Sequence, residues 1–189
     1  MSEFEDAPFF EQMRTCRDAY RRLGDVFHEI VGAQTAYEFG CGVGSQTERL
    51  RELGWTIDGC DGSPHAIEQA DPPGSVRPID LTAAVMFDPR PCVICTETAE
   101  HIAEEHAPMI VRNIAACARD VIIFSAAPPG QEWPGHINLQ PIGYWLTKFR
   151  AHGWDNSEAE TRHLQTRMWQ TEAQHMYCKD NFHVLRPMP

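Results

Sequence analysis

The strongest constraint on the fold is a short loop with glycine at three alternate positions, Gly40, Gly42 and Gly44. The loop follows a β-prone run at 35–39 and precedes a segment at 45–53 that is typical of a helix. Glycine lets a backbone bend tightly and approach a ligand closely, and a plain strand-to-helix turn rarely needs three of them. We therefore expect a strand that ends at a ligand-binding turn.

The same order of strand, turn and helix recurs along the chain. Strands are predicted at 35–39, 55–60, 76–79, 92–95, 121–125 and 176–186. Helices are predicted at 9–31, 45–53, 63–70, 104–119 and 141–152. This alternation predicts an α/β fold, a Rossmann-like doubly wound and mostly parallel sheet with helices on both faces. A chain of 189 residues suits one domain, so residues 1–189 are expected to form a single unit.

An acidic residue stands at or near the end of each of the first three predicted strands: Glu38, Asp61 and Asp80. The first lies beside the glycine loop, where a carboxylate suits a positively charged ligand and repels a pyrophosphate. The second can accept hydrogen bonds from both ribose hydroxyls of a nucleotide. The third could accept one from an adenine amino group. The plainer interpretations are a helix-start acid for Asp61 and a solvated turn acid for Asp80.

These residues resemble the class I S-adenosylmethionine-dependent methyltransferases. In that family an E/DxGxGxG loop holds the methionine end of the cofactor, an acid after the second strand holds the ribose, and an acid near the third strand meets the adenine. The resemblance implies S-adenosylmethionine as the cofactor and an antiparallel strand at the C-terminal end of the sheet. It assigns to cofactor binding Glu38, Gly40, Gly42, Gly44, Asp61, Gly62, Ser63, Asp80, Leu81 and Thr96.

Two later segments resemble a subgroup of these enzymes that acts on small molecules and glycans. The segment TETAEHI, at 96–102, is similar to the family's E-V-x-E-H-[LIV] motif, with Thr98 in place of valine. The stretch 125–145 carries the pattern G-H-x-N-x-Q-P-x-x-Y-W. The resemblance implies an enzyme of class EC 2.1.1 that transfers a methyl group to a hydroxyl or amine of a small molecule or sugar.

The acceptor end of the site is expected at a loop over 126–140, which we interpret as a substrate lid, with residues 1–32 as a helical cap or a mere flank. Methyl transfer needs an in-line acceptor and a group that takes one proton. We assign this role to His136 or alternatively His101, and add Glu97 to the catalytic set. Substrate contacts are assigned to Trp133, Asn138, Gln140 and Tyr144. A loop pinned by its own hydrogen bonds, or packing of the following helix, is the plainer interpretation.

Metal and disulfide chemistry are not expected. The carboxylates and histidines of the acceptor end could form a metal site, but they come from distant segments and show no ligand spacing. These residues are Glu97, Glu100, His101 and His136. The seven cysteines are odd in number and irregularly spaced, which argues against a disulfide framework. Cys92 and Cys95 lie in an apolar predicted strand, where residues three apart point to opposite faces, and we interpret them as buried thiols.

The charge of the chain bears on its partners. There are 16 lysine and arginine residues against 27 aspartate and glutamate residues, for a net charge of −11. Phosphate contacts supply most non-specific nucleic-acid affinity, so this balance argues against nucleic acid and against an anionic membrane surface. The [DN]-P-P-[YFW] motif of nucleic-acid amino-methyltransferases is also absent after the fourth predicted strand. The acidic start shows no signal sequence, so the cytoplasm is the expected compartment.

Two other functions stay open on the sequence. A nicotinamide (NAD)-dependent oxidoreductase could use a similar sheet, but its GxGxxG fingerprint would place glycine where this chain has Ser45. Glu38 would also repel the cofactor's pyrophosphate. A cofactor-binding or regulatory subunit without catalysis would keep the same cofactor residues. The sequence predicts neither the acceptor atom nor the oligomeric state.

Overall fold

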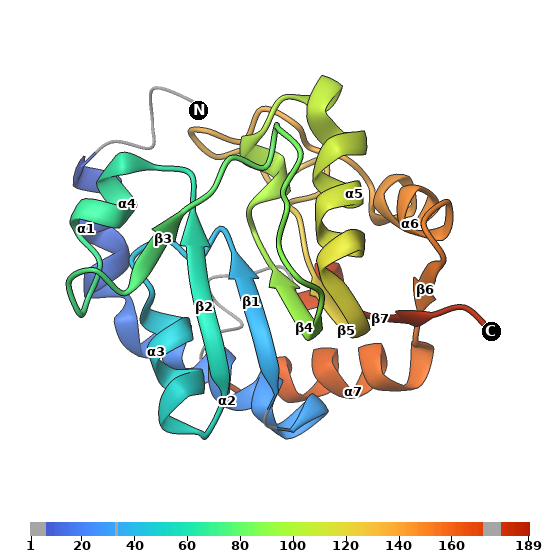
Figure 1. Ribbon diagram of the computed structural model, residues 1–189, viewed down its shortest axis with the longest axis horizontal. Helices are drawn as coiled ribbons and strands as arrows, with labels where there is room; N and C mark the ends of the chain where they lie inside the picture. Colours follow the sequence, from blue (N-terminus) through green and yellow to red (C-terminus); the bar gives the residue numbers. More distant parts are fainter. Residues whose placement is uncertain (1–6, 33, 172–178) are drawn as a thin grey trace.

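A seven-stranded sheet forms the centre of the molecule, with the strand order β3-β2-β1-β4-β5-β7-β6 (Figure 1). The computed structural model describes residues 7–32, 34–171 and 179–189. Strands β1 to β5 run parallel, and β7 pairs antiparallel with both β5 and β6. This arrangement confirms the predicted Rossmann-like doubly wound fold with an antiparallel strand at the C-terminal end of the sheet.

The elements have the following bounds. The strands are β1 (Thr35–Phe39), β2 (Thr56–Asp61), β3 (Val76–Pro78), β4 (Arg90–Cys95), β5 (Ala118–Phe124), β6 (Trp154–Asn156) and β7 (His183–Pro187). The α-helices are α1 (Ala7–Thr15), α2 (Arg17–Val31), α3 (Ser45–Glu52), α4 (Pro64–Glu68), α5 (Ala107–Cys117), α6 (Ile142–Arg150) and α7 (Glu158–Trp169). Short 3-10 helices are η1 (Ala99–His101), η2 (Glu104–His106) and η4 (Lys179–Asn181). In the described ranges, no helix is both long and apolar enough to cross a membrane.

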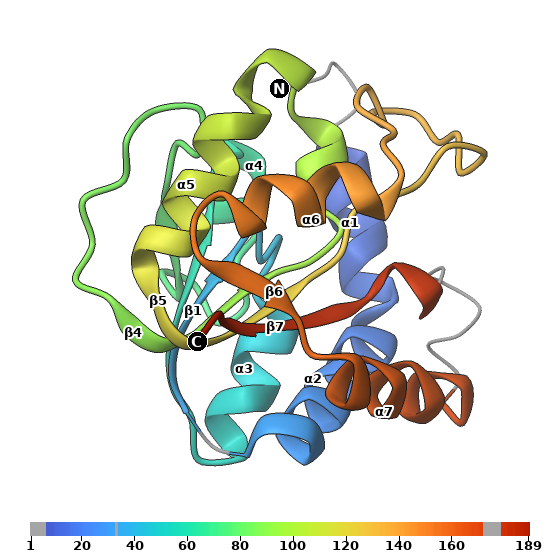
Figure 2. The same cartoon turned by 90° about the vertical axis from the view of Figure 1, so that its right-hand side faces the viewer.

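Two hydrophobic layers cover the sheet, one on each face (Figure 2). Helices α5 and α6 form one layer with buried residues such as Ile110 and Trp145. Helices α2, α3 and α7 form the other, around Phe27. The apolar β4 serves both layers, because Cys92 packs in the second and Cys95 in the first. The sequence predicts these opposite faces correctly, since side chains alternate along a strand.

Two differences from the sequence prediction concern whole elements. The helix predicted over 9–31 is two helices, α1 and α2, which meet at Cys16. The sequence pattern predicts neither β6 nor α7. Strand β6 has only three residues, and α7 is polar except for a narrow buried stripe of Thr161, Leu164 and Met168. With so few buried positions, the sequence of α7 shows little of the apolar periodicity that predicts a helix.

Other differences concern the ends of elements. Helix α3 begins at Ser45, as predicted, with Gly44 at its N-cap in a left-handed conformation with φ of 87°, and it ends at Glu52. The helix predicted to reach 119 ends at Cys117, because the chain continues at once into β5. In the predicted terminal strand, positions 176–178 lie outside the described residues, and β7 begins at His183.

The functional edge of the sheet is set by its topology. All five parallel strands end at the same edge, and β1 lies between β2 and β4. The chain leaves β1 towards β2 and later returns on the other side of β1 as β4. The loops after β1 and β4 therefore diverge, and open α/β sheets bind ligands in the crevice that forms at such a point.

Candidate active site

A cavity of about 980 Å³ lies along the carboxyl ends of β1 to β4. Its floor comes from the segments that follow these strands, including Gly40, Asp61, Asp80 and Thr96. Its other walls come from α1, α2 and the part of the loop over 131–137. A cavity of this size at the crevice of a doubly wound sheet is the expected position of a ligand site.

Each of the three glycines after β1 adopts a positive φ, which side chains rarely tolerate. At Gly40, an added Cβ would come within 2.1 Å of Thr98 Oγ1. At Gly42, it would come within 2.4 Å of the Met13 methyl carbon. Gly40 and Gly42 both line the cavity, and because they have no side chains their backbone is accessible from it. Gly44 does not line the cavity, and its conformation instead starts α3.

Asp61, at the end of β2, holds the glycine loop in place. Its Oδ2 accepts a hydrogen bond of 2.8 Å from the Gly42 amide, and its Oδ1 accepts one of 2.8 Å from the Ser63 amide. Burial raises the pKa of Asp61, and these backbone hydrogen bonds act in the opposite direction. Each carboxylate oxygen can accept a second hydrogen bond, and Asp61, Gly62 and Ser63 all line the cavity.

Glu38 is a buried carboxyl beside the glycine loop that also lines the cavity. It accepts a hydrogen bond from the Thr47 hydroxyl of α3. Burial raises its pKa to about 7, although the Thr47 hydrogen bond and the charge of Arg51 lower it in part. A cationic ligand group in the cavity would favour the ionised carboxylate, which is the charge preference that the sequence predicts for this position.

Asp80 lies on the cavity wall after β3, together with Leu81. Its Oδ1 accepts hydrogen bonds from the Thr82 amide at 2.9 Å and from the Thr82 hydroxyl at 2.6 Å. These bonds lower the pKa of Asp80, so the exposed carboxylate is ionised. The turn geometry matches the plainer interpretation, while the position on the wall keeps Asp80 within the candidate site.

The segment after β4 brings two carboxyl groups together. Glu97 has φ of 49°, a rare conformation for a residue with a side chain. The Ser125 hydroxyl, at the end of β5, donates a hydrogen bond of 2.7 Å to Glu97 Oε1. Burial raises the pKa of Glu97 to about 7. The pKa of Glu100 lies well above its ordinary value because of burial and the adjacent Glu97 carboxyl.

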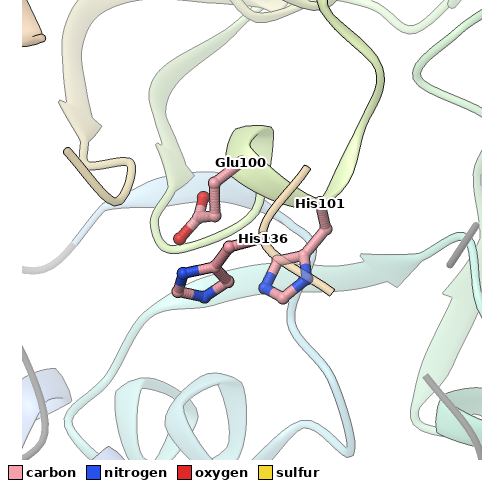
Figure 3. Close-up of side chains that lie close together, drawn as sticks. All are labelled: Glu100, His101 and His136. Atoms are coloured by element: carbon pink, nitrogen blue, oxygen red, sulfur yellow. The ribbon is translucent and has the colours of Figure 1, made fainter. Parts of the chain in front are cut away.

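Two histidines stand at the same end of the cavity, His101 from η1 and His136 from the facing loop (Figure 3). Their rings are 4.9 Å apart and nearly perpendicular, at 82°. The Nδ1 atom of His136 lies 2.8 Å from the carbonyl oxygen of Gln131. A carbonyl oxygen can only accept, so Nδ1 carries the proton and Nε2 of the neutral ring is an acceptor. Burial, and then the charge of His136, lower the pKa of His101 to about 4.

The predicted substrate residues fall into two groups. Trp133 lines the cavity and is 55% exposed. Asn138 is buried and donates a hydrogen bond of 3.1 Å to the Ile102 carbonyl oxygen, and Gln140 donates one of 3.2 Å to Asn138. Tyr144 packs against Trp145 and lies under the Lys148 ammonium group. These last three predicted residues do not line the cavity. The Asn138 side chain instead ties the loop to the segment after η1, and Gln140 bonds to Asn138 within the loop.

Some cavity residues are not among the site residues that the sequence predicts. Helix α1 supplies Phe9, Phe10 and Met13, the junction between α1 and α2 supplies Cys16, and α2 supplies Tyr20. Phe10 is buried together with Val43 of the glycine loop and Ala66 of α4. Gln46, Gln131 and His106 also line the cavity. The sequence suggests residues 1–32 as a helical cap or a flank, and the fold places this helical segment against the cavity.

Solved structures with this fold include S-adenosylmethionine-dependent methyltransferases. A TehB-like methyltransferase of this kind from Corynebacterium glutamicum matches with a TM-score of 0.63 and 15% identity, over 87% of this chain and 86% of that one. The sugar N-methyltransferase KedS8 from Streptoalloteichus sp. matches with a TM-score of 0.62 and 15% identity, over 92% and 87%.

A third similar structure is that of magnesium protoporphyrin IX methyltransferase from Synechocystis, with S-adenosylhomocysteine bound. It matches with a TM-score of 0.57 and 19% identity, over 72% of this chain and 75% of that one. At these identities the similarity establishes the fold. No protein-family model and no curated protein matches the sequence.

Proposed function

We propose that this protein transfers the methyl group of S-adenosylmethionine to a hydroxyl or amine of a small molecule or sugar. One observation carries the proposal. A single cavity joins a glycine loop and three strand-end acids, suited to the cofactor, with a histidine pair suited to the acceptor. Two of the similar structures support it, since they are described as methyltransferases of a magnesium porphyrin and of a sugar.

For the cofactor, we assign its positively charged methionine end to the wall formed by Gly40, Gly42 and Glu38. The exposed backbone of the glycines allows close approach, and Glu38 supplies the negative charge. The ribose hydroxyls then reach the second lone pairs of Asp61, beside Gly62 and Ser63. The adenine lies towards Asp80 and Leu81, and Thr96 borders the sulfonium. Gly44 acts indirectly, through the start of α3.

For the acceptor, we assign the end of the cavity that His101, His136 and Trp133 line. The acceptor atom must lie in line with the methyl group, about 3 Å from it, and water must be kept out. Helix α1 and the loop over 126–140 enclose this end, so we assign them the roles of cap and lid. The lid lies between β5 and α6, which fix both of its ends.

The acceptor proton must leave at the same end. His136 is the proposed proton acceptor, because its Nδ1 proton faces Gln131 and its Nε2 lone pair is available. His101 is the alternative, and its lowered pKa makes it the weaker base. Glu97, paired with Glu100, is a site to which the proton can pass.

The test of the cofactor assignment is the affinity for S-adenosylhomocysteine, measured by titration calorimetry. Asp61→Asn keeps the size of the side chain but removes the charge and one acceptor oxygen. We expect its dissociation constant to rise by on the order of 100-fold, from the loss of two charge-assisted hydrogen bonds to the ribose. The matched control is Asp120→Asn, at an exposed position outside the cavity. Equal affinity in both variants would remove Asp61 from the cofactor site.

A further inference from the structure

Glu100, His101 and His136 form a compact group of metal-type ligands. One ligand atom from each lies within 4.8 Å of the others. Glu100 and His101 are neighbours in η1, and His136 reaches them from the loop after β5 (Figure 3). The loop is fastened at this point, because the amides of Ile137 and Asn138 donate hydrogen bonds of 2.9 and 3.0 Å to the Glu100 carbonyl oxygen.

The buried Glu100 carboxyl group gives a second, separate indication that a cation binds here. It is 0% exposed, and among the described residues neither of its carboxyl oxygens receives a hydrogen bond of ordinary geometry. A buried carboxylate without a cation or donor is costly, so such groups are paired or bind metals. The neighbouring Glu97 is itself an acid and accepts a hydrogen bond from Ser125, so it can pair with Glu100 only through a shared proton. A proton shared by the two carboxyls, or a cation, must neutralise the pair.

His136 is oriented as metal-binding histidines are. Its Nδ1–H donates to the Gln131 carbonyl oxygen at 2.8 Å, which fixes the ring and leaves Nε2 as the ligand atom. A backbone carbonyl in this position sets the tautomer and the orientation of the ring, as it does in metal-bound histidines. The His101 ring stands almost perpendicular to the His136 ring, at 82°. One ring nitrogen from each histidine lies within 4.8 Å of the other and of a Glu100 carboxyl oxygen.

We propose that Glu100, His101 and His136 bind a divalent first-row transition-metal cation at the acceptor end of the cavity, with Glu97 as a neighbouring carboxylate. Two imidazoles and a carboxylate suit Zn²⁺, Fe²⁺, Co²⁺ or Mn²⁺ better than Ca²⁺ or Mg²⁺, which prefer oxygen ligands. Glu100 lies behind the wall while both histidines line the cavity, so the open coordination positions face the acceptor. The cation takes the place of the proton that the two carboxyls share.

The consequence for catalysis refines the proposed function and rests on it. With the cation bound, His136 is a ligand and no longer takes the proton itself. An acceptor hydroxyl that binds the open position loses its proton more readily, because a bound cation lowers the pKa of an oxygen ligand. The neighbouring Glu97 carboxylate, already assigned as a site to which the proton can pass, receives that proton before the methyl group is transferred.

The test is a Co²⁺ titration of the full-length protein after treatment with a chelator, followed by visible absorption. Co²⁺ in a site of nitrogen and oxygen ligands gives absorption bands that report its coordination. We expect one equivalent to bind, and Glu100→Gln and His136→Ala to weaken it by on the order of 100-fold or more. The matched controls, Glu158→Gln and His163→Ala on exposed parts of α7, should bind like the unaltered protein. No binding, or equal binding in all variants, would refute the site.

A second measurement keeps the proposal testable if a variant does not fold. In the unaltered protein, bound Co²⁺ should shift and broaden the imidazole NMR signals of His101 and His136 but not that of His163. Effects on His163 alone would also refute the site. S-adenosylhomocysteine is titrated into the same metal-free protein, so failure of the metal site and failure of the proposed cofactor are read separately.

Discussion

The cofactor end and the acceptor end of the cavity are built in different ways. At the cofactor end, each side chain stands at the end of a strand, and backbone amides satisfy Asp61 within the same two loops. At the acceptor end, residues near 100 meet residues near 136, and the described residues make no hydrogen bond of ordinary geometry to the buried carboxyl oxygens of Glu100. At the cofactor end the buried carboxylate is therefore satisfied by nearby backbone amides, whereas at the acceptor end we propose that a bound cation satisfies Glu100.

The largest effect should come from the acceptor end. We expect His136→Ala to lower methyl transfer by on the order of 10² to 10⁴, whether His136 takes the proton or holds a cation. The affinity for S-adenosylhomocysteine should stay within about twofold, because His136 does not touch the cofactor wall. Single-turnover assays on an acceptor found by screening would measure the rate. An unchanged rate would show that His136 takes no part in the mechanism, and the proposed catalytic role of the acceptor end would lose its main residue.

The next effect concerns the cofactor end and its dependence on pH. Glu38 has a pKa near 4.5 when unfolded and about 7 when folded, so the folded state holds a proton that the unfolded state loses as pH rises from 4.5 to 7. Its contribution to the free energy of unfolding should therefore fall over that range, by about 3 kcal/mol in total, and stay constant above it.

Denaturant unfolding at several pH values measures this contribution. Glu38→Gln cannot ionise, so the difference in unfolding free energy between the variant and the unaltered protein isolates Glu38 from the other buried carboxyls. The variant should gain stability relative to the unaltered protein as pH rises from 4.5 to 7. A difference that is flat with pH would mean that Glu38 is not held in a desolvated position.

The smallest effect should come from Gln140, which lies close to the acceptor end in sequence but away from the cavity. Gln140→Ala removes its hydrogen bond to Asn138 and should lower the unfolding free energy by about 1 kcal/mol. Methyl transfer should be nearly unchanged. A large loss of rate with unchanged stability would instead restore the substrate contact that the sequence suggests for Gln140.

The two ends also differ in how far the sequence predicts them. The strands and the wall residues of the cofactor end follow from local signals: three glycines, a strand-end Asp61, and apolar runs that are typical of buried strands. The sequence suggests Glu100 and His136 as conceivable metal ligands but argues against the site, because no fixed spacing links them and only the fold brings η1 to the lid. The burial of Asn138 could not be predicted for the same reason, since its hydrogen-bond partner, the Ile102 carbonyl oxygen, is distant in the sequence.

The account's central claim is that this cavity binds S-adenosylmethionine. The most direct test is calorimetric titration of the purified protein with S-adenosylhomocysteine, with NADH titrated in parallel. We predict roughly micromolar binding of S-adenosylhomocysteine and no binding of NADH. Binding of NADH alone would contradict the claim, and it would require a new explanation for the carboxyl of Glu38 beside the glycine loop.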